Sequence, residues 1–413
     1  IIAHKHNIGS DEPLIRALPM TIATRNLSLL IGAQLAFVSG SVITVTMGGI
    51  IGAKIAPSAS IATLPVSLMI LGTALGTIPA SRIMQALGRK TGFIGAALAA
   101  AGAMLMAELA IKASLFWLYC IATTCTGVTI AFSQQFRFAA AESVPLHRAG
   151  LAISLILIGS IGGAFLGPEL IAQGERFSDS AFLGALRAAA GLFCIAAILL
   201  ACLSLPKMID DTDEHPDQAA RGLREIAQNP YFLLAVLSGT VGYGVMTYIM
   251  TATPVSMHVH DGHSLTDTAE VIRAHVLAMY VPSLFSGLLI TRFGEKPIIT
   301  LGLIAYVITL GAALAGQQVM HYAISMILLG VGWNFMFVGG TTLLVSTYRA
   351  SERFRVQGIN DAAVFGTSAL GSLLAGTLLS SLGWTTVVIS TVPALVAVSG
   401  MLIWLKGRPA AKI

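Results

Sequence analysis

The sequence predicts an all-α membrane protein of twelve transmembrane helices, arranged as two parallel six-helix bundles. Of its 413 residues, 55% are hydrophobic and only 10% are charged, whereas about 25% are charged in a soluble domain. The apolar residues fall into long runs, and the basic residues gather in alternate connections. A chain with a mean hydropathy of +0.83 is expected to have the lipid bilayer as its solvent, and we expect no nucleic-acid partner.

Twelve apolar runs have the length of roughly 20 residues that a helix needs to cross a bilayer. Glycine, proline and charged residues interrupt them, as connections between helices should. The predicted spans are residues 27–51, 59–81, 92–111, 115–139, 149–171, 181–204, 231–255, 269–290, 297–315, 320–347, 357–380 and 385–405.

The basic residues also predict the orientation of the chain. If the N-terminus is cytoplasmic, only Lys54, Lys112 and Arg176 of the 24 Lys and Arg residues fall in outer loops. Such a bias toward one side follows the positive-inside rule. We therefore expect a multi-pass protein of the inner (plasma) membrane with both termini in the cytoplasm.

An internal repeat divides the spans into two halves. Gly88 and Gly294 stand 206 positions apart in similar segments after the second and eighth spans, and Arg148 and Arg355 stand 207 apart. A repeat of six helices with preserved orientation indicates two parallel units. We predict an N-terminal bundle, a cytoplasmic linker and a C-terminal bundle, at residues 1–204, 205–229 and 230–413.

With these features the chain resembles the major facilitator superfamily over nearly its whole length. In that family the loop between the second and third helices reads roughly G-x-L-a-D-r-x-G-R-K. This chain has the matching Gly88, Arg89 and Lys90, but Ser81 replaces the first glycine and Gln85 replaces the aspartate. The departure concerns the residue that helps to latch the cytoplasmic side in the family.

The fifth span resembles one branch of that family, the drug/proton antiporters. Gly159, Gly163, Gly167 and Pro168 match their G-x-x-x-G-x-x-x-G-P motif, whereas Thr123 stands where the family has an arginine in the fourth helix. The alternative interpretation of these glycines is helix packing, because small residues at every fourth position let two helices approach closely.

The resemblance implies a secondary active transporter, not an enzyme, that moves a small molecule by alternating access. We expect an amphipathic or aromatic substrate, either neutral or anionic, together with proton coupling, a monomer in the lipid bilayer and no cofactor. The glycine motif favours efflux. The alternative is a proton-coupled importer of a nutrient, vitamin or metal-siderophore, and a non-transporting membrane receptor is less favoured.

Charged residues inside a bilayer are costly and therefore mark functional positions. Arg137 shares a helix face with Gln134, and it is expected to bind an anionic substrate group or to pair with Asp361, which follows Asn360, in a cytoplasmic gate. The alternatives are that Arg137 extends to the cytoplasmic surface and that Asp361 stabilises a helix N-terminus.

Other ionisable residues are candidates for gating or proton coupling. Glu142 is expected to form a salt bridge with the loop that contains Arg89, or else to be a solvated acid. Glu169, Asp361 and His275 are the candidates for carrying a coupled proton.

Aromatic and amide residues are predicted to bind the substrate. Trp333 and Phe337 are four residues apart in the tenth span and share a face, with Asn334 beside them. Such a group suits a cavity wall that stacks on a ring, although helix packing is the alternative. Further candidates in the helices expected to line the cavity are Gln34, Gln134, Gln135, Tyr243 and Tyr248. We expect no catalytic residue and no metal site.

Overall fold

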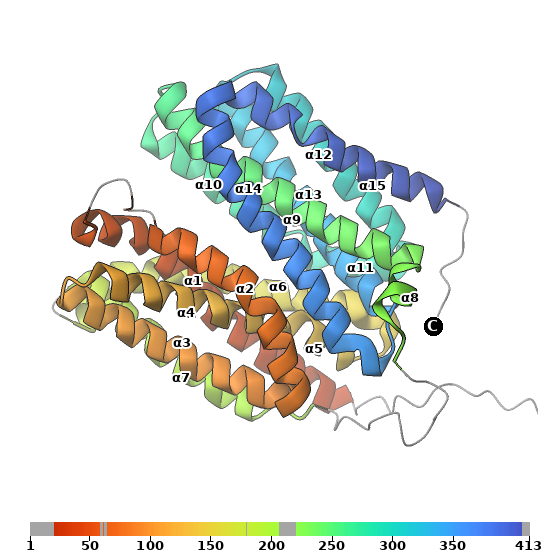
Figure 1. The fold of residues 1–413 in the computed structure, drawn as a ribbon, viewed down its shortest axis with the longest axis horizontal. Helices are drawn as coiled ribbons and strands as arrows, with labels where there is room; N and C mark the ends of the chain where they lie inside the picture. Colours follow the sequence, from red (N-terminus) through yellow and green to blue (C-terminus); the bar gives the residue numbers. More distant parts are fainter. Residues whose placement is uncertain (1–19, 58–60, 62–63, 179, 206–219, 407–413) are drawn as a thin grey trace, which may run out of the picture.

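A computed structural model describes residues 20–57, 61, 64–178, 180–205 and 220–406. These residues form two helical bundles that lie side by side (Figure 1). Eleven helical segments of the described chain are long and apolar enough to cross a membrane. The first part of α14 (Arg353–Ile389), up to a break at Gly383, takes the place of the predicted eleventh span. The predicted fold class is therefore confirmed.

The N-terminal bundle contains the first six predicted spans. Its helices are α1 (Met20–Ile55), α2 (Leu64–Leu87), α3 (Arg89–Lys112), α4 (Phe116–Ser133), α5 (Phe136–Glu142), α6 (Ala149–Ala172) and α7 (Ala181–Ala201), with short 3₁₀ turns at Leu146–Arg148 and Gly174–Arg176.

The C-terminal bundle contains the other six. After the short α8 (Leu223–Ala227), its helices are α9 (Pro230–Val255), α10 (Leu265–Tyr280), α11 (Ser283–Phe293), α12 (Glu295–Ala315), α13 (Val319–Val345), α14 and α15 (Val392–Trp404), with a π turn at Ser256–His260 and a 3₁₀ turn at Ala350–Glu352. Most of the predicted linker, residues 206–219, lies outside the described residues, so the bundle boundaries stay a prediction.

Two glycines show why the repeat is visible in the sequence. Gly88 joins α2 to α3 with a φ of 83°, and Gly294 joins α11 to α12 with a φ of 84°. Residues with a side chain rarely adopt this left-handed conformation, whereas glycine adopts it freely. Each glycine therefore makes the same tight turn in its own bundle.

Three spans that we predicted as single helices are interrupted. The twelfth breaks at Ser390 and Thr391, between α14 and α15. The fourth breaks at Gln134 and Gln135, between α4 and α5. The eighth breaks at Val281 and Pro282, between α10 and α11, because proline cannot donate the hydrogen bond that a continuous helix requires. The break in the fourth span places Gln135 at the interface between the bundles, where it donates to Asp361.

The outer surface and the two cores follow the expected distribution of residue types. Large apolar side chains such as Leu75, Leu109 and Ile403 are more than 60% exposed, which suits a surface in contact with lipid. The N-terminal core is rich in alanine, especially along α3. The C-terminal core contains large rings, including Tyr306 and Trp333.

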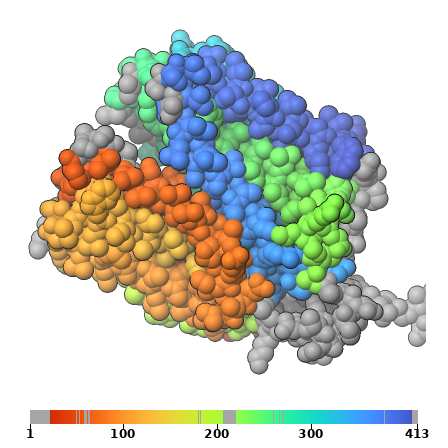
Figure 2. Space-filling model, in the orientation of Figure 1, coloured from red at the N-terminus to blue at the C-terminus, as the bar shows by residue number. Residues whose placement is uncertain are grey.

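The bundles meet closely at one end, which we call the closed end. Ser81 of α2 donates a hydrogen bond to the Phe354 carbonyl of α14. A Cβ on Gly287 would lie 2.6 Å from the Cα of Leu151, so α11 and α6 touch backbone to backbone. Figure 2 shows α2 and α14 meeting along the visible face, and the ribbons of the two bundles diverge toward the opposite end in Figure 1.

Candidate functional site

A buried ion pair joins the two bundles at the closed end. Arg137 of α5 donates to the Asp361 carboxylate of α14, and these residues are 2% and 0% exposed. Gln135 donates to the other carboxylate oxygen of Asp361, Oδ2, at 2.7 Å. Asn360 donates to Oδ1, the oxygen that Arg137 also contacts, at 3.0 Å. Burying two charges is costly unless they are paired and hydrogen-bonded, and here both conditions hold. The predicted Arg137–Asp361 contact is present.

Aromatic rings enclose the cation of this pair. The Arg137 guanidinium lies 4.7 Å from the ring centre of Phe138 and 4.6 Å from that of Phe337. Gln134, three residues earlier on the same segment, accepts a hydrogen bond from Arg137 at 3.3 Å. The charge is therefore held between the bundles, and it does not reach out to an aqueous surface.

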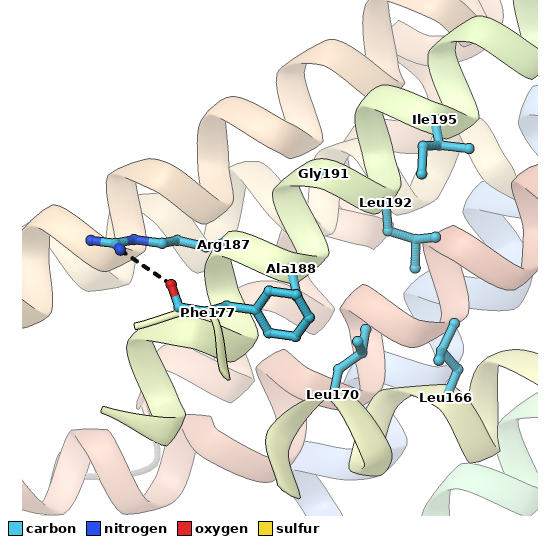
Figure 3. A pocket seen from close by; sticks show the side chains of 8 residues that line it. All are labelled: Leu166, Leu170, Phe177, Arg187, Ala188, Gly191, Leu192 and Ile195. Atoms are coloured by element: carbon cyan, nitrogen blue, oxygen red, sulfur yellow. Dashed lines mark hydrogen bonds between the residues drawn. The ribbon is translucent and has the colours of Figure 1, made fainter. Parts of the chain in front are cut away.

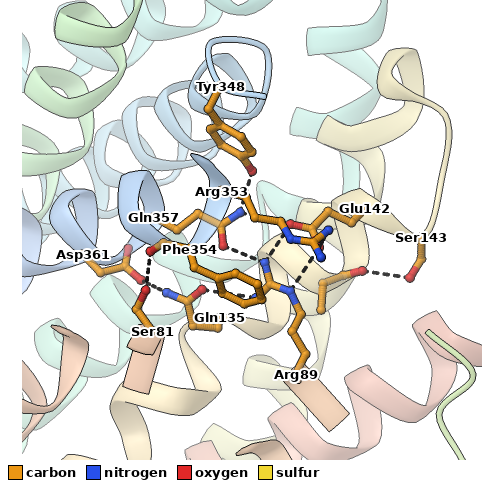
Figure 4. A network of polar contacts seen from close by, with 11 residues as sticks. Ser81, Arg89, Gln135, Glu142, Ser143, Tyr348, Arg353, Phe354, Gln357 and Asp361 are labelled. Carbon is orange, nitrogen blue, oxygen red and sulfur yellow. Dashed lines mark hydrogen bonds and ion pairs between the residues drawn. The ribbon is translucent and has the colours of Figure 1, made fainter. Parts of the chain in front are cut away.

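A second polar cluster lies beside the ion pair (Figure 4). Arg89 donates to both carboxylate oxygens of Glu142, at 2.7 and 3.0 Å. It also donates to Gln135 at 3.3 Å and to Gln357 of the other bundle at 2.6 Å. Gln135 thus touches both clusters and connects them into one network. The predicted salt bridge between Glu142 and the Arg89 segment is present.

The sequence did not point to several members of this network. Gln357 donates to Glu142 at 3.1 Å and to the Tyr348 hydroxyl at 2.5 Å, and Arg353 lies 3.6 Å from Glu142. Gln357 is four residues before Asp361 and so shares its helix face. That spacing was the available signal for Gln357.

Next to the ion pair lies a group of rings that we call the aromatic cluster, formed by Tyr243, Tyr280, Trp333, Phe337 and Phe365. Trp333 and Phe337 stack with ring centres 5.1 Å apart. Tyr243 stands edge-on to Trp333, Phe337 and Phe365 at 5.1 to 5.4 Å. The Trp333 Nε1–H is buried without a hydrogen-bond partner. The cluster therefore offers flat surfaces and one free donor beside a neutralised charge pair.

Three predicted binding residues lie in contacts between helices of one bundle. Asn334 donates to the Met279 carbonyl and the Ser283 hydroxyl, at 2.8 and 2.6 Å, and so holds α13 against the break between α10 and α11. Gln34 of α1 donates to Ser160 of α6 at 3.0 Å. The Tyr248 hydroxyl lies 3.0 Å from that of Ser390.

The structure does not bring the other two proton-coupling candidates into the network. His275 is buried in α10, with Nδ1 2.7 Å from the Met326 carbonyl. Glu169 is exposed and accepts a hydrogen bond from Gln173. The nearby Arg187 pairs instead with Glu108, at 2.8 Å.

A hollow on the flank of α6 and α7 is lined by apolar side chains, including Leu166, Phe177 and Ile195 (Figure 3). Arg187 lies at its rim and donates to the Phe177 carbonyl at 3.3 Å. This hollow contains none of the candidate binding residues. Within the described chain, no group of three or more His, Cys, Asp or Glu residues is arranged to hold a metal ion.

Comparisons with known proteins identify relatives of the chain. The sequence profile of the Major Facilitator Superfamily matches residues 29–272 and 262–413. A riboflavin transporter, RfnT of Brucella anthropi, is 39% identical over 89% of this chain and 92% of its own length. The multidrug resistance protein MdtG of Dickeya zeae is 24% identical over 83% of each chain.

Solved structures give the same fold. The fucose:proton symporter FucP of E. coli matches with a TM-score of 0.69 over 93% of this chain and 99% of its own, at 14% identity. A bacterial homologue of the iron transporter ferroportin matches with a TM-score of 0.67 over 93% and 100%, also at 14% identity.

Proposed function

We propose, on the premise that this chain belongs to the Major Facilitator Superfamily and is a transporter, that it imports a planar aromatic vitamin of the riboflavin class. The observation that carries the proposal is the 39% identity to a riboflavin transporter over most of both chains. This favours the importer alternative of the sequence analysis over efflux.

The aromatic cluster supports a planar substrate. Aromatic rings attract one another in stacked or edge-on arrangements, worth about 0.5–1.5 kcal/mol beyond the burial of area. Trp333 and Phe337 already lie nearly parallel, at 14°, and Tyr243 is only partly buried. A flat ring system that replaces solvent beside Tyr243 gains these contacts without a charged partner.

The closed end supports an alternating-access cycle. We place this end on the cytoplasmic side, because Arg89, Arg353 and Arg355 gather there, as the positive-inside rule predicts. The described conformation is then outward-facing, with the ion pair and the Arg89–Glu142 cluster closing the inner exit. Opening that exit requires α2 and α5 to part from α14, which breaks the Arg137–Asp361 pair and the contacts of Gln357 and Arg353 with the Arg89–Glu142 cluster.

Asp361 is the group through which a proton would act. Protonation of its carboxylate removes the charge that balances Arg137, and an unbalanced buried charge is strongly unfavourable. The closed end would then be less stable, so proton binding and inward opening would be coupled. His275 and Glu169 lie outside the network that must break, and they are weaker candidates for this role.

Uptake of radiolabelled riboflavin tests the proposal. The chain is expressed in cells that lack riboflavin synthesis and uptake, and it is also reconstituted in liposomes with and without an inward proton gradient. We expect saturable uptake, which is stimulated by the gradient and lost in Asp361→Asn. Absence of riboflavin uptake, or net export from preloaded vesicles under the same gradient, would contradict the proposal.

A further inference from the structure

We propose that a ladder of hydroxyl groups between α9 and α14, formed by Thr247, Thr251, Ser368 and Ser372, is the subsite for the polyhydroxyl side chain of a flavin. This inference rests on the proposed function. The aromatic cluster accounts for the ring system of the substrate, and the ladder accounts for its polyhydroxyl side chain.

The ladder continues the aromatic cluster in register. Tyr243 and Phe365 face each other with ring centres 5.1 Å apart. One turn further along both helices, Thr247 donates to Ser368 at 3.4 Å, and one turn beyond that the hydroxyl oxygens of Thr251 and Ser372 lie 3.4 Å apart. Residues three or four apart share a helix face, so the ring pair and the two hydroxyl pairs form three successive levels along one line.

The line leads away from the closed end. Along α14 the order is Asp361, Phe365, Ser368 and Ser372, starting from the buried ion pair. A substrate that enters from the opposite end would therefore meet the ladder first and the rings last. A ring that stacks on the aromatic cluster would leave its side chain along the ladder.

The hydroxyl pairs are poorly bonded to each other. Their separations of 3.4 Å exceed the roughly 2.7–2.8 Å that is usual between hydroxyl oxygens. A hydroxyl has one donor and two acceptor positions, and Thr247, Thr251 and Ser372 are only partly buried. The Thr251 O–H donates to the Thr247 carbonyl at 2.7 Å, so Thr251 offers acceptor positions only. A polyol can donate to Thr251 and can both donate and accept at Thr247 and the two serines, so it would satisfy these groups better than they satisfy each other.

Free polar atoms also lie at the ring end of the line. The Trp333 side chain is 2% exposed, and its Nε1–H has no partner. The hydroxyl of Thr240, three residues before Tyr243, is buried without a partner as well. A buried donor that lacks an acceptor costs about 1–3 kcal/mol. The carbonyl oxygens and ring nitrogens of a flavin are acceptors of the kind that these donors require.

The charge around the ladder favours a neutral side chain. Neither α9 (Pro230–Val255) nor the part of α14 beyond Asp361 contains a charged residue. Arg137 is paired with Asp361 and enclosed by rings. A phosphate at the end of the polyol would therefore meet no cation on these two helices, so we expect flavin mononucleotide to bind much more weakly than riboflavin.

Two flavins that share one ring system separate the ladder from the rings. Riboflavin carries the polyol, and lumiflavin carries a methyl group in its place. Binding of each to the purified protein is measured by titration of flavin fluorescence. In Thr247→Val/Thr251→Val we expect ~10-fold or greater loss of riboflavin affinity, because two hydrogen-bonding levels are removed, with lumiflavin affinity unchanged within about twofold.

Two control variants keep the test independent of folding. Thr247→Ser/Thr251→Ser retains the hydroxyls and should restore riboflavin affinity. Thr253→Val removes a hydroxyl of the same helix that donates to the carbonyl four residues earlier, as Thr251 does, but contacts the Met326 sulfur and not α14, and it should change neither affinity.

The outcomes distinguish this inference from the proposed function. If the valine variant loses both flavins equally, or if wild type binds riboflavin and lumiflavin equally well, the ladder packs helices and the inference is wrong. If wild type binds neither flavin, the proposed function itself is wrong.

Discussion

The fourth spans of the two bundles occupy equivalent places in the repeat, yet they differ in structure and chemistry. In the N-terminal bundle, α4 and α5 are separated by a break, and α5 holds Arg137 and Glu142. In the C-terminal bundle, α13 is unbroken, contains no Asp, Glu, Lys or Arg, and presents Trp333 and Phe337. The N-terminal copy thus carries charges, whereas the C-terminal copy carries none and contributes rings to the aromatic cluster.

The difference indicates a division of work between the bundles. The charges of α5 reach across to Asp361, and so they act on the relation between the bundles. The rings of α13 contact Tyr243 and Tyr280 within their own bundle. Apart from the contact of Phe337 with Arg137, they therefore form a surface that keeps its shape when the bundles move. Variants on the two sides should therefore affect closure and substrate affinity separately.

The largest effect is expected for the ion pair. Arg137→Leu or Asp361→Asn leaves the other charge buried without its partner, which costs about 3–5 kcal/mol. We expect a lower melting temperature in detergent and no riboflavin uptake for each single variant.

The double variant Arg137→Leu/Asp361→Leu removes both charges and should recover most of the melting temperature, since apolar replacement of a buried pair is often neutral. It should not recover uptake. Single variants as stable and active as wild type would refute the role of the pair.

A smaller effect is expected for the second cluster. Glu142→Gln removes the charge that accepts a hydrogen bond from Gln357 and pairs with Arg353 across the bundles, and bonds to charged groups are worth about 1.5–3 kcal/mol. The closed end should open more often. A cysteine at Ser286, which faces Ser154 across the bundles at 3.1 Å, should react roughly tenfold faster with a thiol reagent in a background without the native cysteines.

Glu175→Gln provides the matched control for that experiment, because Glu175 is an exposed acid after α6. It should leave the labelling rate unchanged. Equal labelling in Glu142→Gln and wild type would show that Arg89 and Glu142 do not hold the end closed.

The next effect concerns the rings. Trp333→Ala removes one stacking surface, and we expect flavin affinity to fall by roughly tenfold, since an aromatic contact contributes about 0.5–1.5 kcal/mol beyond its area. Thiol labelling at Ser286→Cys should not change. Trp117→Ala alters an exposed tryptophan of α4 and should leave affinity intact. If Trp333→Ala changed the labelling rate but left flavin affinity unchanged, the rings would act on closure and not on substrate binding.

The sequence predicted the charged part of the site better than its neutral part. Charges in apolar spans are rare and expensive, so Arg137, Glu142 and Asp361 stood out. Their partners could be inferred from the membrane side that they share and from the resemblance to the family. Gln357 and Tyr348 did not stand out, because neutral polar residues occur throughout membrane helices. Glu169 also looked unusual, but its exposure depends on helix rotation, which hydropathy alone does not determine.

The smallest effect concerns the turns that precede α6 and α14. The turn Leu146–Arg148 has no buried residue, whereas the equivalent turn Ala350–Glu352 buries Glu352. Glu352 accepts hydrogen bonds from the Arg221 side chain at 2.6 and 2.8 Å and from the Arg349 backbone at 2.9 Å. The C-terminal bundle thus ties its turn to the segment before α8.

The hydrogen bonds that Glu352 accepts from Arg221 and Arg349 should weaken at low pH. Burial acts to raise the pKa of Glu352, but the hydrogen bonds from Arg221 and Arg349 outweigh it and lower the pKa from 4.5 to about 2. The stabilisation is therefore complete above pH 4.5 and is lost as pH falls toward 2. Between pH 6 and 3 the melting temperature of wild type should fall more steeply than that of Glu352→Gln, while Glu175→Gln should follow wild type. Parallel curves for wild type and Glu352→Gln would mean that this carboxylate contributes nothing to the difference between the two turns.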